Sequence, residues 1–188
     1  MGKISISGDL GSGKSSVCKV LEREYGFEAY STGAIQREIA CSMGMSTYEF
    51  NVYTETHPEI DDLIDDNLKA LSSSDRDMVI DSRLAWHFVK NTFKVYLVTD
   101  IHVAAQRIKS ANRGPDEAYA DLKEAEDTIL ARRESEKARY LKKYGVDIMD
   151  FSNYDMVLDT TGLSIDETAA RIMAEYQETK HSIGIALR

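Results

Sequence analysis

The stretch GDLGSGKSS, residues 8–16, places glycines at 8, 11 and 13 immediately before Lys14 and Ser15. This spacing fits G-x-x-x-x-G-K-[ST], in which backbone N–H groups surround phosphate oxygens, the lysine reaches the β- and γ-phosphates, and the hydroxyl holds Mg²⁺. The sequence therefore predicts an ATP site with Mg²⁺ on Ser15. The residues of this predicted site are Gly8, Asp9, Leu10, Gly11, Ser12, Gly13, Lys14, Ser15 and Ser16.

Arginines elsewhere in the chain are candidates to hold a second anion, the acceptor of a phosphoryl group. Arg83 follows an apolar stretch in VIDSRLA, and Arg37 lies shortly after STG. Arg132 and Arg139 flank position 136 at the helical spacings of four and three. A guanidinium group matches phosphate oxygens with two parallel hydrogen bonds. For each arginine, the alternative is a solvated surface position with ordinary charge pairing along a helix.

Short apolar stretches alternate with helical patterns along the chain. Strands are expected in KISIS, FEAYS, DMVIDS, FKVYLVTD and YDMVLDTT. Helices are expected over 14–25, 32–44, 58–71, 102–110 and 115–143, and capping boxes at Ser46–Glu49 and Ser164–Glu167 predict two more. This alternation is typical of parallel β-α-β units. We therefore predict a single α/β domain, a doubly wound parallel sheet of about five strands with helices on both faces.

The bulk properties limit the partners. The 188-residue chain has a formal net charge of −9, which opposes broad binding to nucleic acid or to an anionic membrane. Its two cysteines lack metal-ligand spacing, and no apolar run is long enough to span a membrane. We expect a cytoplasmic protein, with a monomer favoured. Six acids between Glu55 and Asp66 would repel phosphate unless they turn away or carry a metal, and residues 181–188 have no clear pattern.

Several motifs, taken in order, resemble the cytidylate kinase family in its short, archaeal-like form. They are ISISGDLGSGKSS, YSTGAIQREIA, VIDSRLA, QRI…NRG and RRESEKARYLKKYGVDIMDFSNYDMVLDTT. The resemblance extends from about Lys3 to Tyr176. It implies a P-loop kinase domain over residues 1–188, with a short region for the nucleoside monophosphate (NMP) at about 34–72 and a helical lid at about 107–140. The implied reaction is phosphoryl transfer from ATP, with Mg²⁺, to a pyrimidine nucleoside monophosphate, CMP or dCMP.

The resemblance also implies roles for individual residues. It implies that the acceptor nucleotide contacts Ser31, Arg37, Arg83, Arg132, Glu136 and Arg139, with Arg83 on the monophosphate and the helix of residues 132–139 serving cytosine and phosphates. It implies that Arg107 and Arg113 close over the transferring group and that Asp81 orients Mg²⁺ through water. The chain departs from the family at Ser82 (usually Gly), Glu136 (Asp in the long form) and Arg133 (often an acid), and these changes bear on acceptor identity.

Two other classes of function fit the same motifs. One is a P-loop kinase for another small acceptor, such as a different monophosphate, dephospho-coenzyme A or shikimate. The other is a regulatory protein that holds a nucleotide and transfers nothing. An assay of acceptor-dependent ADP release separates these classes, because only a kinase for the added acceptor gives it.

Overall fold

The strands form one parallel sheet in the computed structural model, which describes residues 2–45, 47–110 and 119–186. The described strands are β1 (Lys3–Gly8), β2 (Glu28–Ser31), β3 (Met78–Asp81), β4 (Thr92–Val98) and β5 (Met156–Asp159), in the order β2-β3-β1-β4-β5. In the register, Ile6 lies beside Asp81, and Gly8 lies beside Leu97. Because parallel strands end at a common edge, the polar residues that follow them gather there. The predicted fold class is confirmed.

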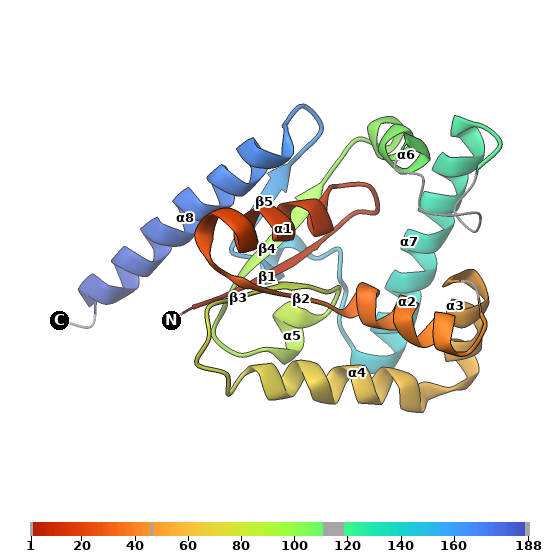
Figure 1. Ribbon diagram of the computed structural model, residues 1–188, viewed down its shortest axis with the longest axis horizontal. Helices are drawn as coiled ribbons and strands as arrows, with labels where there is room; N and C mark the ends of the chain where they lie inside the picture. Colours follow the sequence, from red (N-terminus) through yellow and green to blue (C-terminus); the bar gives the residue numbers. More distant parts are fainter. Residues whose placement is uncertain (1, 46, 111–118, 187–188) are drawn as a thin grey trace.

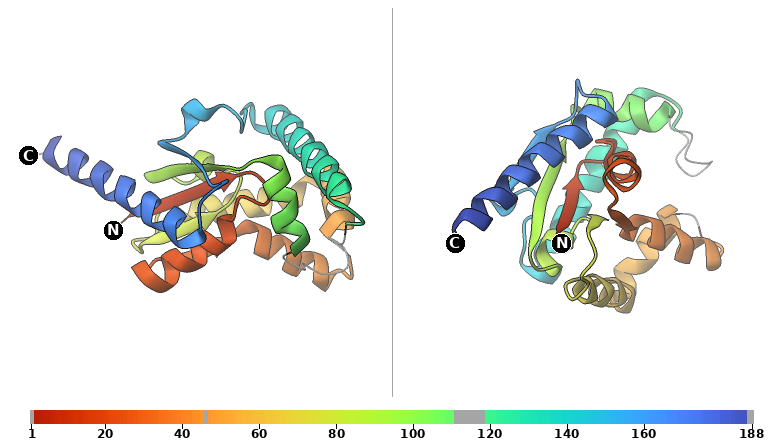
Figure 2. Two further views of the ribbon diagram at one scale, coloured as in Figure 1. Left: turned by 90° about the horizontal axis from the view of Figure 1, so that it is seen from above. Right: turned by 60° about the vertical axis from the view of Figure 1, so that its left-hand side comes forward.

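Helices cover both faces of this sheet (Figures 1 and 2). On one face, α1 (Lys14–Tyr25) and α8 (Ile165–Ala186) pack on Ile4, Ile6 and Val79. On the other face, α4 (Pro58–Leu71) and α5 (Ala85–Phe88) pack on Met78 and Ile80. Alternate side chains of a strand point to opposite faces, so the apolar run of β3 is buried on both sides.

The remaining helices stand at the carboxyl edge of the sheet. They are α2 (Thr32–Ser42), α3 (Thr47–Thr56), α6 (Ile101–Ser110) and α7 (Leu122–Tyr144). A short 3-10 helix, η2 (Phe151–Asn153), comes directly before β5, toward the amino end of that strand. An apolar contact between α6 and α7 joins Ala104 and Ile108 to Ala125 and Ile129. This contact holds α7 beside the end of the sheet, and Figure 1 shows α7 upright at the right-hand side of the molecule.

Local signals explain where most helices begin and end. Gly26 ends α1 in the left-handed conformation, at φ 74°. Ser164 and Glu167 form the expected capping box, with N–H···O distances of 2.8 and 3.1 Å. The predicted start of the long helix at Pro115 is wrong, because residues 119–121 are not helical and Asp121 caps α7 by accepting from the Glu124 N–H at 2.8 Å.

Other elements differ from those expected, or lie beyond what the structure describes. The short α5 was not predicted, and α8 continues through residues 181–186, where the sequence has no clear pattern. Ser46 lies outside the described residues, so the structure does not test its cap. No helix in the described part of the chain is long and apolar enough to cross a membrane.

Candidate active site

The glycine loop joins β1 to α1 and is pressed against neighbouring backbone. Gly8 has φ +142°, and a Cβ there would lie 2.7 Å from the Leu97 nitrogen of β4. Gly11 has φ +80°, and its Cβ would lie 2.8 Å from the Ala104 oxygen of α6. No side chain caps the N-terminus of α1, which begins directly after Gly13. The loop therefore offers an uncapped helix N-terminus of the kind that binds phosphate.

Lys14 folds back into this loop. Its Nζ donates to the carbonyl oxygens of Gly8 at 2.9 Å and Asp9 at 2.6 Å. Burial, together with the positive charge of Arg83, lowers the pKa of Lys14 from 10.5 to about 7. A cation held in an electropositive and poorly solvated place gains most from an anion placed beside it. This environment favours the binding of a phosphate at Lys14.

Ser15 and Asp81 bring two oxygen ligands together. The Ser15 hydroxyl donates to Asp81 Oδ2 at 2.7 Å, and Ser31 approaches the same oxygen at 3.5 Å. Asp81 ends β3 and is buried. A hydroxyl beside a carboxylate fits Mg²⁺, which prefers oxygen and takes most of its other ligands from phosphate and water. The described residues contain no cluster of three or more His, Cys, Asp or Glu able to hold a metal by themselves.

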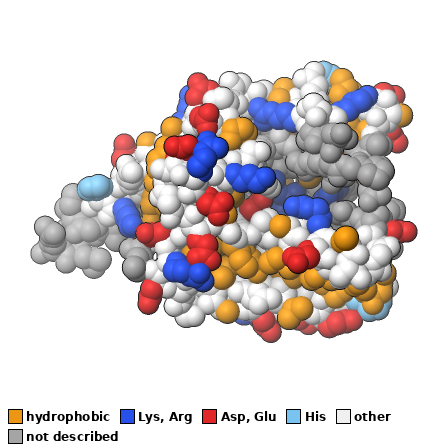
Figure 3. All heavy atoms as spheres, viewed as in Figure 1, with side chains coloured by type: hydrophobic (Ala, Val, Ile, Leu, Met, Phe, Trp, Pro, Cys, Tyr) orange, Lys and Arg blue, Asp and Glu red, His pale blue; other side chains and the backbone are white. Residues whose placement is uncertain are grey.

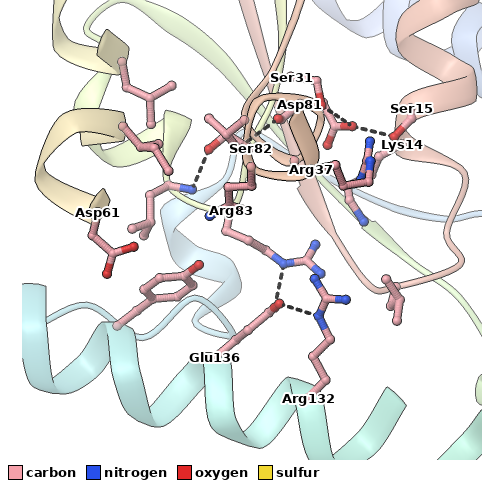
Figure 4. A pocket seen from close by; sticks show the side chains of 18 of the residues that line it. Lys14, Ser15, Ser31, Arg37, Asp61, Asp81, Ser82, Arg83, Arg132 and Glu136 are labelled. Atoms are coloured by element: carbon pink, nitrogen blue, oxygen red, sulfur yellow. Dashed lines mark hydrogen bonds and ion pairs between the residues drawn. The ribbon is translucent and has the colours of Figure 1, made fainter. Parts of the chain in front are cut away.

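Glu136 bridges two arginines across the cavity. Arg83 Nε donates to Glu136 Oε2 at 2.7 Å, and Arg132 Nε donates to Oε1 at 2.9 Å (Figure 4). Burial alone would raise the pKa of Glu136, but Arg83 and Arg132 overcome it and lower the pKa from 4.5 to about 2. Arg83 also donates to the Gly8 carbonyl of the glycine loop. The carboxylate thus fixes two guanidinium groups next to the loop.

Arg133, the next residue of α7, turns to the other side of the loop. Its Nη2 lies 3.0 Å from Asp9 Oδ1. Asp9 is buried and also accepts from the Tyr96 hydroxyl at 3.2 Å and the Thr99 N–H at 3.3 Å. The Asp9 side chain therefore ties the glycine loop to both α7 and the end of β4. This contact gives Arg133 a structural partner that the sequence did not indicate.

A cavity of about 150 Å³ lies at the carboxyl edge of the sheet and gathers most of the predicted site residues. Figure 3 shows the surface hollowed between the glycine loop and α2, with Lys and Arg side chains at the edge of the hollow. The predicted residues that line the cavity are Leu10, Gly11, Gly13, Lys14, Ser15, Ser16, Ser31, Arg37, Asp81, Arg83, Arg132, Glu136 and Arg139. Segments far apart in the sequence therefore meet in one place.

Arg107, one of the two predicted lid arginines, is not in this group. Arg107 on α6 points to the loop after β5, where its Nη2 donates to the Thr160 carbonyl at 2.7 Å and its Nη1 lies 3.3 Å from the hydroxyls of Thr99 and Thr160. These contacts fasten α6 to that loop rather than leaving the guanidinium in the cavity. Arg113 lies outside the described residues. The roles that the resemblance implies for both stay predictions.

The end of the cavity away from the glycine loop contains residues that the sequence analysis missed. Asp61 and Asp65 of α4 are buried there and face Tyr140 and Tyr144 of α7. The Tyr144 hydroxyl donates to Asp65 Oδ2 at 2.7 Å. A signal was present, because positions 61, 64, 65 and 68 have the spacing of one helix face and Ile64 and Leu68 are apolar. The acids at 61 and 65 therefore stand on the buried side of α4.

Comparisons with known proteins show which proteins this chain resembles. A family model for the cytidylate kinase-like family matches residues 3–162. A cytidylate kinase from Thermoplasma acidophilum is 36% identical over 180 residues, which cover 94% of this chain and 93% of that protein. An S-adenosylmethionine-dependent nucleotide dehydratase from Lacinutrix mariniflava is 35% identical over 94% of this chain, but the match spans only 36% of that protein.

Among solved structures, a shikimate kinase from Bacteroides thetaiotaomicron superimposes with a TM-score of 0.64. The match covers 94% of this chain and 98% of that one, at 17% sequence identity. At this identity the likeness shows a shared kinase fold and carries no information about the acceptor.

Proposed function

The chain belongs to the cytidylate kinase-like family, and from that premise we propose that this nucleoside monophosphate kinase transfers a phosphoryl group from ATP to CMP or dCMP and releases the corresponding diphosphate. Its relatives of similar length are named cytidylate kinases, which supports the pyrimidine acceptor. The similarity to one part of a nucleotide dehydratase adds no second activity to the proposal.

One observation supports the proposal above the others: the two phosphate-binding groups of residues meet in a single cavity. The donor side contains the glycine loop with Lys14 and Ser15. The acceptor side contains Arg83 and Arg132, held by Glu136. Arg83 links the two sides, because it donates to the carbonyl of Gly8. Such an arrangement supports direct transfer, which requires two phosphate groups to lie end to end.

The protein's part in the reaction is positioning and neutralisation of charge. The glycine loop and Lys14 hold the β- and γ-phosphates of ATP, and Arg83 and Arg132 hold the monophosphate. The arginines stabilise negative charge on the phosphoryl oxygens during transfer, an effect that can contribute about 10³–10⁵ in rate. No side chain needs to act as a general base, because the acceptor oxygen already belongs to a phosphate anion.

Mg²⁺ fits the oxygen pair at the end of β3. Ser15 would hold it through the hydroxyl, with Asp81 orienting its water, and the two oxygens lie 2.7 Å apart. The ion would supply positive charge to the phosphates of ATP.

We also propose, from the sequence, that the lid region of about 107–140 closes over the site and that the NMP region is about 34–72. We further propose that the chain acts as a single cytoplasmic domain, with a monomer favoured.

The experiment that tests the proposal is an acceptor panel. The purified protein receives ATP and Mg²⁺ with CMP, dCMP, UMP, AMP, shikimate or dephospho-coenzyme A, and ADP release is measured. We expect release with CMP or dCMP that exceeds the acceptor-free rate by orders of magnitude. Release only with shikimate or dephospho-coenzyme A would replace the proposal by another kinase activity. ATP binding with no release in any reaction would indicate a regulatory nucleotide-binding protein.

A further inference from the structure

The acidic helix α4 presents its carboxylates to two different surroundings. Asp61 and Asp65, four residues apart, are 8% and 6% exposed and line the cavity. Asp62 and Asp66 point outward, with side chains that are 65% and 73% exposed. Figure 4 shows Asp61 extending from α4 toward the cavity. Only the inward pair can contact a molecule bound in the cavity.

The two inward carboxylates differ in how they are compensated. Asp61 has cations on both oxygens, with Arg139 at 3.9 Å and Lys143 at 3.5 Å. Asp65 has the Tyr144 hydroxyl on Oδ2, whereas its Oδ1 has no hydrogen-bond partner and no cation in ion-pair contact within the described part of the chain. Burial raises the pKa of Asp65 above its ordinary value, which marks it as poorly solvated. One oxygen of a buried acid thus remains available for a hydrogen-bond donor from a ligand.

The charges of the cavity fix the direction in which an acceptor nucleotide lies. Lys14, Arg83 and Arg132 stand near the glycine loop, and the two carboxylates stand near α4. A buried carboxylate repels phosphate, so the monophosphate must lie at the cationic end. The base of the nucleotide then extends toward α4, where Ile64, Leu68 and Tyr140 supply apolar and aromatic surface beside Asp65.

The hydrogen-bonding groups of the bases decide which base fits beside the carboxylate oxygen of Asp65. An ionised carboxylate can accept hydrogen bonds but cannot donate them. Cytosine presents its exocyclic amino group, a donor, where uracil presents a carbonyl oxygen, an acceptor. Glu136 is less suited to the amino group than Asp65, because its Oε1 already accepts from Arg132 and its Oε2 from Arg83, whereas Asp65 Oδ1 has no donor in the described part of the chain.

We propose that Asp65 determines the specificity for the acceptor base: its Oδ1 accepts a hydrogen bond from the exocyclic amino group, and Tyr144 positions the carboxylate for that contact. The proposal rests on the proposed function, since it names the group that recognises the base of the acceptor nucleotide. It assigns cytosine over uracil, and it assigns the choice to α4 rather than to Glu136. The acidic stretch of residues 55–66 thereby gains a role for one of its inward members.

The first test uses the substitution Asp65→Asn and the ratio of kcat/KM for CMP to kcat/KM for UMP. An Asn oxygen can still accept from the Tyr144 hydroxyl, which turns the amide N–H groups toward the base. We expect the ratio to fall by about 100-fold, because the amino group loses its acceptor while the uracil carbonyl gains a donor. The control is Asp66→Asn, an exposed neighbour on the same helix, which should leave the ratio unchanged.

A second measurement uses the unchanged protein, so that it does not depend on the folding of a variant. A CMP analogue with hydrogen in place of the amino group should lose about 100-fold in kcat/KM relative to CMP. The positioning residue is tested by Tyr144→Phe, for which we expect a higher KM for CMP, little change in kcat, and a smaller fall in the CMP to UMP ratio.

The outcomes separate this inference from the proposed function. If the unchanged protein phosphorylates no monophosphate, the proposed function fails and the inference falls with it. If the protein phosphorylates CMP, but UMP and the analogue are used equally well, the inference alone is overturned. An Asp65→Asn variant that loses CMP and UMP activity in equal proportion also overturns it, because that result indicates only structural support by Asp65.

Discussion

Replacing Glu136 with Gln should both destabilise the protein and weaken acceptor binding. The substitution keeps the shape of the side chain but removes the negative charge that Arg83 and Arg132 share. The pKa of Glu136 lies at about 2 instead of 4.5, and at 1.36 kcal/mol per pKa unit this corresponds to about 3 kcal/mol of folding free energy. The side chains of Glu136 and Arg83 are only 14% and 18% exposed, so solvent screens the ion pair little. Removal of one partner from a buried pair costs about 3–5 kcal/mol, which agrees with this figure.

Thermal unfolding at pH 7 measures the first part of this prediction. For a chain of this size a loss of about 3 kcal/mol should lower Tm by about 6–12 °C, since each kcal/mol shifts Tm by about 2–4 °C. Because the pKa of Glu136 is lowered by folding, its contribution is complete above about pH 4.5 and fades as the pH falls toward about 2. The difference in Tm between the variant and the unchanged protein should therefore shrink in acid.

Steady-state kinetics measure the second part. With the two arginines no longer held in place by a shared carboxylate, kcat/KM for CMP should fall by about 100-fold, whereas the affinity for an ATP analogue should change by less than about threefold. The matched control is Glu134→Gln, an exposed position two residues earlier on α7, which should change neither property. A Glu136→Gln variant with unchanged Tm, or with equal losses for both nucleotides, would refute the reasoning.

Three other substitutions test separate parts of the site. Lys14→Ala should lower kcat by at least about 10³-fold, because the Lys14 ammonium is expected to stabilise bound phosphate. It should not lower the Tm of the ligand-free protein, because burial disfavours the charged lysine in the fold. Wild-type activity would exclude the glycine loop as the donor site. Arg132→Ala should reduce kcat/KM for CMP about 100-fold more than it reduces affinity for ATP, and equal reductions would argue against an acceptor-side role. Arg133→Gln should destabilise the protein by about 1–3 kcal/mol, and a second substitution, Asp9→Asn, should restore much of the loss in thermal unfolding, because it removes the unpaired buried charge. Additive losses in that pair would contradict the contact.

The sheet and the glycine loop were predictable because each depends on local sequence. Three glycines, a lysine and a serine in fixed spacing specify one loop conformation, and the φ values at Gly8 and Gly11 require residues without a side chain. The five strands follow from short apolar stretches with helices between them. The start of α7 was misplaced because Pro115 was preferred to the cap formed by Asp121 and Glu124. The four-residue α5 is too short to show a periodic pattern.

The candidate site was predictable only in part, because its second half depends on contacts across the fold. Position and spacing made Arg83 and Arg132 candidates, the resemblance implied their roles at the acceptor, and the structure brings them together on Glu136. The pairing of Asp65 with Tyr144 joins residues 79 positions apart, on helices whose separation no local pattern specifies. The same reason explains why Asp9 was assigned to ATP while its link to α7 was missed.

The most direct measurement of the central claim follows the phosphoryl group itself. The protein is incubated with CMP, Mg²⁺ and ATP labelled in the γ-phosphate, and the labelled products are separated. The account predicts that the label appears in CDP, with one ADP formed for each CDP, because both nucleotides lie in the same cavity. Label that appears only as inorganic phosphate, or that stays in ATP while CMP is unchanged, would contradict it.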